Sequence, residues 1–103
     1  MLNPDPKHPG TILADRFLEP ARLAPTALAI EIRVPPSRMT ETANGKRNVS
    51  LDTAFRLARF FGNRVEDWLM WQMEWEIAQA RKAGIEARVN EDVRPRSARR
   101  EAA

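Results

Sequence analysis

Apolar residues recur every three to five positions along most of the chain, and no stretch alternates strictly between apolar and polar residues. The first pattern is typical of one face of an α-helix, whereas the second would indicate a half-buried strand. With the prolines and glycines that interrupt it, the spacing predicts five helices: one after Gly10 that Pro20 ends, one from about Pro25 to near Arg33, one from Pro36 to Asn44, one after Ser50 that stops before Gly62, and one from Val65 to about Ala83. The sequence therefore predicts an all-α domain.

The predicted boundaries rest on capping and turn chemistry. A proline is tolerated in the first turn of a helix, so Pro25 and Pro36 can each begin one. Ser50 is a good N-cap for the fourth helix, and Asn63 followed by Glu66 resembles a capping box for the fifth. These local signals separate the helices by only a few residues each, as in a small helical bundle.

The length of 103 residues suits one compact domain with tails. We divide the chain into an N-terminal arm over 1–9, a domain over 10–83, and a polar tail over 84–103 that has little to bury and is expected to be flexible or disordered. The chain has no cysteine, no run of about 18 apolar residues and no secretory signal pattern. A cytoplasmic location is therefore expected.

The formal net charge of +3 is concentrated in one window. Residues 33–47 contain Arg33, Arg38, Lys46 and Arg47 against Glu41, which also gives +3. An excess of positive charge over a predicted helix and the loop after it favours a polyanion as partner. A second basic run, four arginines within residues 94–100, is interpreted as an ordinary solvated surface.

The residues that an enzyme needs are scarce. His8 is the only histidine, tyrosine is absent, and the serines have no evident base near them in the sequence. The sequence also lacks a Gly-rich phosphate loop and a cluster of metal ligands. We therefore predict no catalytic site, no metal and no cofactor, and we interpret His8 as a surface residue or a residue at the start of a helix.

Two helices joined by a short turn, the second almost without apolar side chains, are typical of a helix-turn-helix that reads DNA in the major groove. The candidate base-reading residues on the second helix are Ser37, Arg38, Thr40 and Glu41. Arg38 is expected to grip guanine, and Glu41 either accepts a hydrogen bond from cytosine or, as we favour, orients Arg38 through a salt bridge. The candidate phosphate-binding residues are Thr26, Lys46 and Arg47. The predicted partner is double-stranded operator DNA.

The ordered series HPGTIL, FLEP, TALA, RVPPSRM, NGKR, DTAFRLARFFG and EDWLMWQ resembles the HigA family of antitoxins, a branch of the Xre/Cro-type helix-turn-helix proteins. The likeness spans roughly residues 8–83, most of the chain. It implies a five-helix, lambda-repressor-like domain that dimerises and binds its own promoter. It also implies a protein partner, a HigB toxin that cleaves mRNA and belongs to the RelE class.

Three positions depart from the family pattern. Arg33 stands where relatives usually have glycine, so the turn must either strain a non-glycine residue or use another geometry. Pro25 stands where many relatives have a glutamine that contacts the DNA backbone, and Thr42 stands where they have an apolar residue. These departures put one phosphate contact and the seating of the third helix in question.

Trp68, Trp71 and Trp75 follow one another at intervals of three and four residues on the fifth predicted helix. Part of this stripe must pack on the domain itself, yet three indoles exceed what a helix in so small a domain readily hides. Aromatic residues are enriched in protein interfaces. We therefore predict that the three tryptophans form the interface of a homodimer, with toxin docking as a competing use of the same surface.

Three functions remain open from the sequence. The leading hypothesis is an antitoxin of a type II toxin–antitoxin system that neutralises its toxin and represses its own operon as a dimer. The alternative is a stand-alone Xre-family transcriptional repressor without a toxin partner. The third is a protein-interaction module that has lost DNA binding, against which the basic residues Arg38, Lys46 and Arg47 argue.

Overall fold

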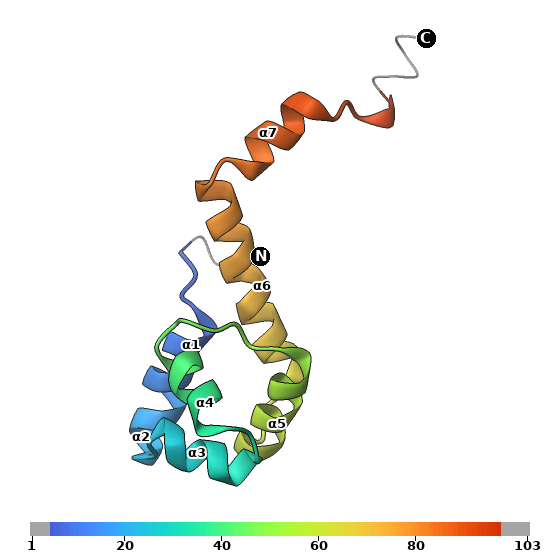
Figure 1. The fold of residues 1–103 in the computed structure, drawn as a ribbon. Helices are drawn as coiled ribbons and strands as arrows, with labels where there is room; N and C mark the ends of the chain where they lie inside the picture. Colours follow the sequence, from blue (N-terminus) through green and yellow to red (C-terminus); the bar gives the residue numbers. More distant parts are fainter. Residues whose placement is uncertain (1–4, 98–103) are drawn as a thin grey trace.

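The computed structural model describes residues 5–97, and every regular element that it assigns there is helical (Figure 1). In chain order the elements are α1 (Pro9–Ile12), the π-helix η1 (Leu13–Leu18), α2 (Glu19–Ala21), α3 (Pro25–Ile32), α4 (Pro36–Ala43), α5 (Leu51–Phe61), α6 (Val65–Lys82) and α7 (Ile85–Asp92). The all-α prediction is confirmed. The second to fifth predicted helices correspond to α3, α4, α5 and α6.

The first predicted helix does not end at Pro20. It continues from α1 through η1 into α2, which carries Pro20 in its first turn. Across the π turn, the amide of Glu19 donates to the carbonyl of Ala14, five residues back. A proline has no amide hydrogen, and its ring clashes with the carbonyl four residues back in an α-helix. The wider turn avoids this clash, so the prediction that Pro20 stops the helix is wrong.

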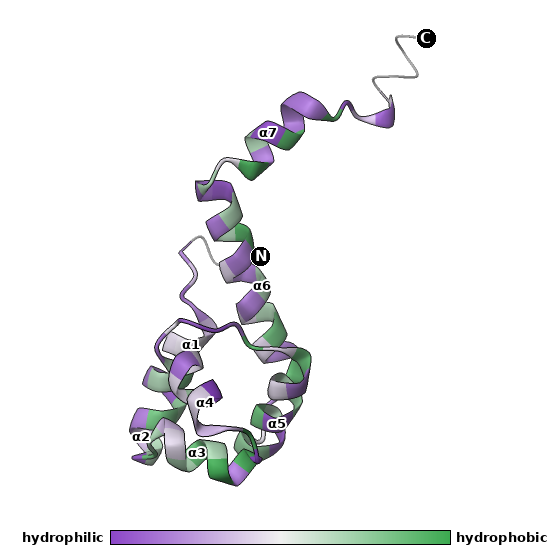
Figure 2. Cartoon of the chain, viewed as in Figure 1, coloured by the Kyte–Doolittle hydropathy of each residue, from purple (hydrophilic) through white to green (hydrophobic). Residues whose placement is uncertain are grey.

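The hydrophobic core lies among η1, α3, α4, α5 and the first half of α6. Its fully buried side chains include Leu13, Leu28, Met39, Leu57 and Trp68. Hydrophobic and hydrophilic residues are interleaved along the helices, as Figure 2 shows, because each helix buries only one stripe. Burial of each large apolar side chain contributes about 1.5–3 kcal/mol, so these few contacts hold the helices around one core.

The start of α6 differs from the predicted capping box. The amide of Arg64, the residue before α6, donates to the carboxylate of Asp67 at 3.0 Å. The side-chain oxygen of Asn63 instead accepts a hydrogen bond from the indole Nε1 of Trp68 at 2.9 Å. The prediction that Asn63 and Glu66 form the box is wrong, because the buried tryptophan needs the Asn63 oxygen as its acceptor.

The C-terminal part of α6 extends beyond the globular body, and α7 follows it outward (Figure 1). Gly84 separates the two helices in the left-handed conformation, with φ 81°. The prediction of a disordered segment after residue 84 is wrong over Ile85–Asp92, which form α7 although every side chain is exposed. Residues 1–4 of the predicted arm and residues 98–103 of the predicted tail, with two of its four arginines, lie outside the described residues. No helix between residues 5 and 97 is both long and apolar enough to cross a membrane.

Candidate nucleic-acid interface

Helices α3 and α4 form the predicted helix-turn-helix, and residues 33–35 connect them (Figure 1). Arg33 ends α3 in the left-handed region, with φ 62° and ψ 53°. Pro35 precedes α4, and Pro36 occupies its first turn. Of the two geometries open at Arg33, the chain therefore adopts the strained one, which costs a non-glycine residue about 1–2 kcal/mol. This turn lets α4 change direction within three residues of the end of α3.

Helix α4 buries only a narrow stripe. Met39 and Thr42 are fully buried, whereas Ser37 and Thr40 are exposed. The hydroxyl of Thr42 donates to the carbonyl of Arg38 at 2.7 Å, so the buried oxygen is satisfied within the helix. The polar residue at position 42 is thus compatible with a seated α4, and the opposite face stays free for a ligand.

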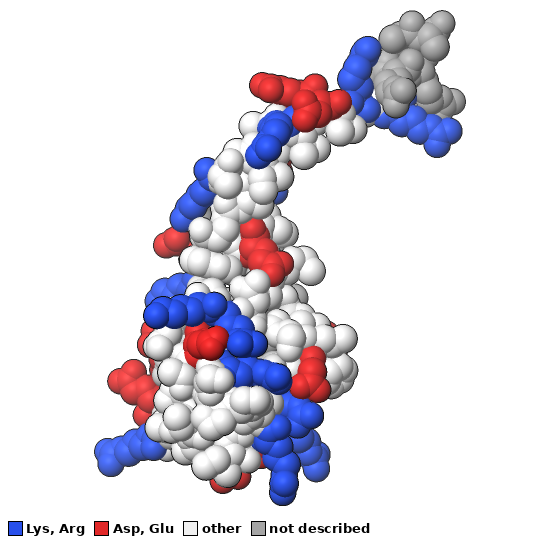
Figure 3. All heavy atoms as spheres, viewed as in Figure 1, with Lys and Arg blue, Asp and Glu red and all other residues white. Residues whose placement is uncertain are grey.

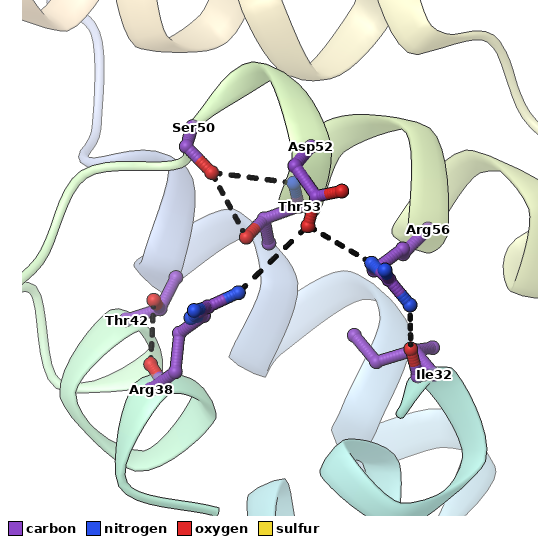
Figure 4. A network of polar contacts seen from close by, with 7 residues as sticks. All are labelled: Ile32, Arg38, Thr42, Ser50, Asp52, Thr53 and Arg56. Carbon is purple, nitrogen blue, oxygen red and sulfur yellow. Dashed lines mark hydrogen bonds and ion pairs between the residues drawn. The ribbon is translucent and has the colours of Figure 1, made fainter. Parts of the chain in front are cut away.

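Arg38 is held by a neighbouring helix. Its Nη1 atom lies 3.8 Å from the carboxylate of Asp52 at the start of α5 (Figure 4). The same carboxylate accepts a hydrogen bond from Arg56 Nε at 2.9 Å, and Arg56 Nη1 donates to the carbonyl of Ile32 at 3.0 Å. This network joins α4 to α5 and to the end of α3. The prediction that Glu41 orients Arg38 is wrong, because Asp52 is the carboxylate that reaches its guanidinium.

Glu41 belongs instead to the loop after α4. Its carboxylate pairs with Arg47 Nη2 at 3.1 Å, and its carbonyl accepts a hydrogen bond from the amide of Lys46 at 2.8 Å. Gly45 closes α4 with φ 75°, as the sequence predicts. Lys46 and Arg47 are both exposed, and Figure 3 shows basic side chains gathered around α4 and this loop. Because an exposed ion pair contributes little, Arg47 can leave Glu41 for a phosphate.

Thr26 lies exposed in the first turn of α3. The residue before this helix, Ala24, provides no side-chain cap, so amides at the N-terminus of α3 remain available to an anion. Among residues 5–97, the structure pairs Glu41 with Arg47 directly. The candidate side chains for which no hydrogen bond or ion pair with another candidate residue is seen are Thr26, Ser37, Arg38, Thr40 and Lys46.

A set of polar contacts that the sequence analysis missed holds the segment after the loop. The amide of Val49 donates to Gln72 Oε1 at 2.8 Å, and Gln72 Nε2 donates to Glu76 Oε1 at 3.1 Å. The same Glu76 oxygen accepts a hydrogen bond from Asn48 Nδ2 at 3.4 Å. The only sequence signal was a glutamine and a glutamate four residues apart on α6. These contacts hold the segment that follows the basic loop against α6.

His8 is buried rather than on the surface, and it caps α1. Its Nδ1 atom accepts a hydrogen bond from the amide of Gly10 at 2.8 Å, and its ring lies edge-on to Trp75 at 5.5 Å. Gly10 packs so closely on α4 that an added Cβ would lie 1.6 Å from the carbonyl oxygen of Thr42. Burial lowers the pKa of His8, and the side chain of Asn48 opposes part of this shift. Within residues 5–97, no group of His, Asp and Glu side chains is arranged to hold a metal ion.

The tryptophan stripe packs mainly within its own chain. Trp68 is fully buried, with its ring 5.0 Å from Phe17 and 5.1 Å from Trp71. The guanidinium of Arg16 covers Trp71 at 5.4 Å, and Trp75 rests against the buried imidazole. The prediction that Trp68 lies in a dimer interface is wrong, because Phe17 on η1 covers it and leaves no surface for a partner. Trp71 and Trp75 are half-buried.

Known proteins resemble this chain both in sequence and in structure. No protein-family model matches the sequence. Virulence-associated protein I of Dichelobacter nodosus is 40% identical over 73 residues, which cover 71% of this chain and 68% of that protein. The antitoxin HigA of Pseudomonas aeruginosa, solved with the higBA promoter, has a TM-score of 0.83 at 32% identity over 89% of this chain and 99% of its own. An addiction module antidote protein of the HigA family from Coxiella burnetii has a TM-score of 0.80 at 37% identity over 87% and 97%.

The chain belongs to the HigA family. This confirms the resemblance stated from the sequence and the Xre-like helix-turn-helix fold that it implies. The two solved relatives are antitoxins, and antitoxins are not enzymes. In this HigA-family chain, α3 and α4 form the helix-turn-helix, and Gln72 on α6 binds the segment that follows it.

Proposed function

We propose that this HigA-family chain is the antitoxin of a type II toxin–antitoxin system. It represses its own operon in the cytoplasm by binding operator DNA as a dimer, and it neutralises a HigB/RelE-type toxin that cleaves mRNA. The observation that carries the DNA-binding part is the exposed polar face of α4 followed by the basic loop at Lys46 and Arg47. Support comes from the similar Pseudomonas aeruginosa HigA, which was solved with promoter DNA.

The exposed face of α4 enters the major groove in this proposal. Ser37 and Thr40 carry exposed hydroxyl-bearing side chains near the start and middle of the helix, and Glu41 follows Thr40. Arg38 reads guanine, because a guanidinium forms two hydrogen bonds with the O6 and N7 acceptors. Its ion pair with Asp52 limits the orientations of the guanidinium before DNA binds, which lowers the entropy lost on binding.

Phosphate contacts flank this helix. Lys46 and Arg47 neutralise phosphates from the loop after α4, and Thr26 adds its hydroxyl and the N-terminal amides of α3. Arg47 exchanges Glu41 for a phosphate when DNA binds, which leaves the Glu41 carboxylate beside the bases. Such contacts position the domain on the duplex without reading sequence.

The toxin contact uses a different surface. A toxin that cleaves RNA binds a polyanion and is therefore basic, so acidic side chains away from α4 are the matching partners. Asp15 on η1 and Glu19 on α2 are exposed, whereas Glu66 and Asp67 on α6 are engaged with Arg64. Asp15 and Glu19 are therefore the carboxylates that we assign to the toxin.

The deciding experiment separates the two activities. The variant with Arg38, Lys46 and Arg47 changed to alanine should no longer bind the promoter in a gel-shift assay. It should still rescue cells that express the toxin encoded by the neighbouring gene of the operon. The matched control changes Arg81, Lys82 and Arg88 to alanine. These three basic residues lie on α6 and α7, so the control removes the same charge and should keep both activities.

The double change Asp15→Lys and Glu19→Lys should give the opposite pattern, with operator binding kept and rescue lost. Far-UV circular dichroism checks that each variant is folded. A folded Arg38/Lys46/Arg47 variant that fails to rescue growth would show that the two surfaces are not separate. Rescue that is absent even for the unchanged chain would favour a stand-alone repressor without a toxin.

A further inference from the structure

The start of α1 contacts both α4 and α6, and the loop after α4 passes beside it (Figure 1). His8, the residue before α1, is only 6% exposed. Its Nδ1 atom accepts a hydrogen bond from the amide of Gly10 at 2.8 Å, and its ring lies 5.5 Å from the ring of Trp75 on α6. A Cβ added to Gly45, in the loop after α4, would lie 3.8 Å from the imidazole. One buried ring therefore joins α1, the loop and α6.

The carbonyl of Thr42 is the point at which α1 meets the recognition helix α4. A Cβ on Gly10 would lie 1.6 Å from this oxygen, so the close approach of the two helices requires glycine. The same carbonyl accepts a hydrogen bond from the amide of Gly45 at 3.0 Å, and the next amide, that of Lys46, donates to the carbonyl of Glu41 at 2.8 Å. A shift of Gly10 would therefore move the end of α4 and the start of the basic loop together.

We propose that His8 is a positioning residue for operator recognition, whose neutral imidazole holds α4 and the basic loop in their DNA-binding arrangement and whose protonation releases them. This step rests on the proposed function. Because Nδ1 accepts the amide of Gly10, the neutral ring carries its proton on Nε2. A second proton would occupy Nδ1, so that two donors would face each other and the cap of α1 would be lost. Operator affinity then depends on pH through a ring that does not touch the DNA.

The side chains and backbone around the ring carry no charge that would stabilise the protonated form. Nε2 is buried and makes no well-aligned hydrogen bond within residues 5–97. Burial lowers the pKa of His8, and the side chain of Asn48 opposes part of this shift. The charged groups of the neighbouring segments are Asp5 and Lys7 before the ring, Lys46 after Gly45, and Glu74 and Glu76 on either side of Trp75. Of these, Glu76 is linked to the ring only through Asn48, whose Nδ2 atom donates to its carboxylate.

The first test uses the free chain and does not depend on DNA. Amide NMR spectra recorded between pH 5 and 8 follow the four glycines of the chain. The amides of Gly10 and Gly45 should shift with the same midpoint as the His8 ring, because both are connected to it through the start of α1. Gly62 and Gly84, which end α5 and precede α7, are internal controls and should not follow this midpoint. In His8→Asn the shared titration should disappear.

The second test measures operator affinity over the same pH range by fluorescence anisotropy at constant ionic strength. The neutral ring is the binding form, and its pKa in the free chain lies below the ordinary histidine value of about 6.5. Affinity should therefore be constant above this value and fall as the pH drops below it, by at most about tenfold per pH unit for one proton. His8→Asn should give a flat profile, because asparagine can cap a helix but does not titrate. Circular dichroism at each pH checks that the chain is folded.

The salt dependence of binding distinguishes positioning from a merely structural role. A general loss of stability would leave the phosphate contacts of the bound domain unchanged. Displacement of the basic loop would remove the contact that we assign to Lys46. The slope of log affinity against log salt should therefore be shallower by about one unit at the acidic end of the profile than at pH 8. For His8→Asn the two slopes should be equal.

Three results would overturn the proposal. They are a Gly45 amide that does not follow the titration of the His8 ring, a pH profile of operator affinity that is the same for the unchanged chain and His8→Asn, and a salt slope that does not change with pH. The proposed function fails separately, through an unchanged chain that does not bind the operator at pH 8. In that case the glycine amides of the free chain still decide whether His8 is coupled to the end of α4.

Discussion

The guanidinium of Arg38 on α4 lies 3.8 Å from the carboxylate of Asp52 on α5. The residue that we propose as the base reader is thus oriented from outside its own helix. Asp52 also accepts a hydrogen bond from Arg56, which in turn reaches the last carbonyl of α3 (Figure 4). The recognition helix α4, the helix α3 before it and α5 are therefore linked through one carboxylate.

Replacing Asp52 with asparagine tests this relationship. The free energy of unfolding should change by less than about 1 kcal/mol, because the side chains of the pair are 32% and 62% exposed. The ratio of operator affinity to scrambled-duplex affinity should fall severalfold, since Arg38 loses its orientation while the loss of a negative charge favours every duplex. The control is Glu86→Gln on α7, which removes an exposed carboxylate that pairs with Arg81 on α6. It should leave the affinity ratio unchanged. Fluorescence anisotropy on both duplexes measures it.

Arg38 and Lys46 should respond differently to truncation. Arg38→Ala should relax selectivity at one base pair, because a bidentate contact with guanine discriminates by about 1–3 kcal/mol. Lys46→Ala should lower the affinity for all sequences alike and make the salt dependence shallower by about one unit, because it removes one phosphate contact. Binding isotherms at several salt concentrations on operator and scrambled duplexes distinguish the two. An unchanged operator preference in Arg38→Ala would contradict the role of Arg38.

The helix-turn-helix could be predicted because its signals are local. Pro25, Pro36 and Ser50 each begin or cap a helix through their own backbone chemistry, and Gly45 ends one through its freedom at positive φ. These residues act within a few positions of themselves. No knowledge of the tertiary fold is needed to read them.

The partners of the site residues could not be predicted, because they depend on what packs across the core. The spacing of the tryptophans indicates that they follow one another along one side of α6, yet only the fold shows that Phe17 covers Trp68. The carboxylate of Asp52 reaches Arg38 from the next helix, whereas Glu41, closer in sequence, is drawn to Arg47 in the loop. Periodicity indicates which side of a helix is buried but not which residues bury it.

Two arginines in the left-handed conformation offer a test of stored strain. Arg22 has φ 52° and Arg33 has φ 62°. Replacing either one with glycine should raise the free energy of unfolding by about 0.5–1 kcal/mol, because glycine adopts this region without a Cβ clash. Gln79→Gly, at a right-handed position inside α6, should instead lose about 1 kcal/mol. Urea unfolding followed by circular dichroism measures all three. A loss of stability in Arg22→Gly would show that the side chain outweighs the strain.

The buried imidazole of His8 should make stability depend on pH. Burial lowers its pKa, so the unfolded chain takes up a proton more readily than the folded one. The stabilisation is therefore complete above the ordinary histidine pKa of about 6.5 and is lost as the pH falls through the lower pKa of the folded state. Protonation would also occupy Nδ1, the atom that accepts the amide of Gly10 at the start of α1.

His8→Asn isolates this effect. Asparagine retains a side-chain oxygen that can cap α1, but it does not titrate, and His8 is the only histidine in the chain. Urea unfolding between pH 5 and 8 should show the unchanged chain losing at most about 1.4 kcal/mol per pH unit below the histidine range, as expected for the uptake of one proton. The variant should give a flatter curve over the same interval. Equal slopes for the two proteins would place the pH dependence on carboxylates instead, and His8 would then act only as a cap and as the partner of Trp75.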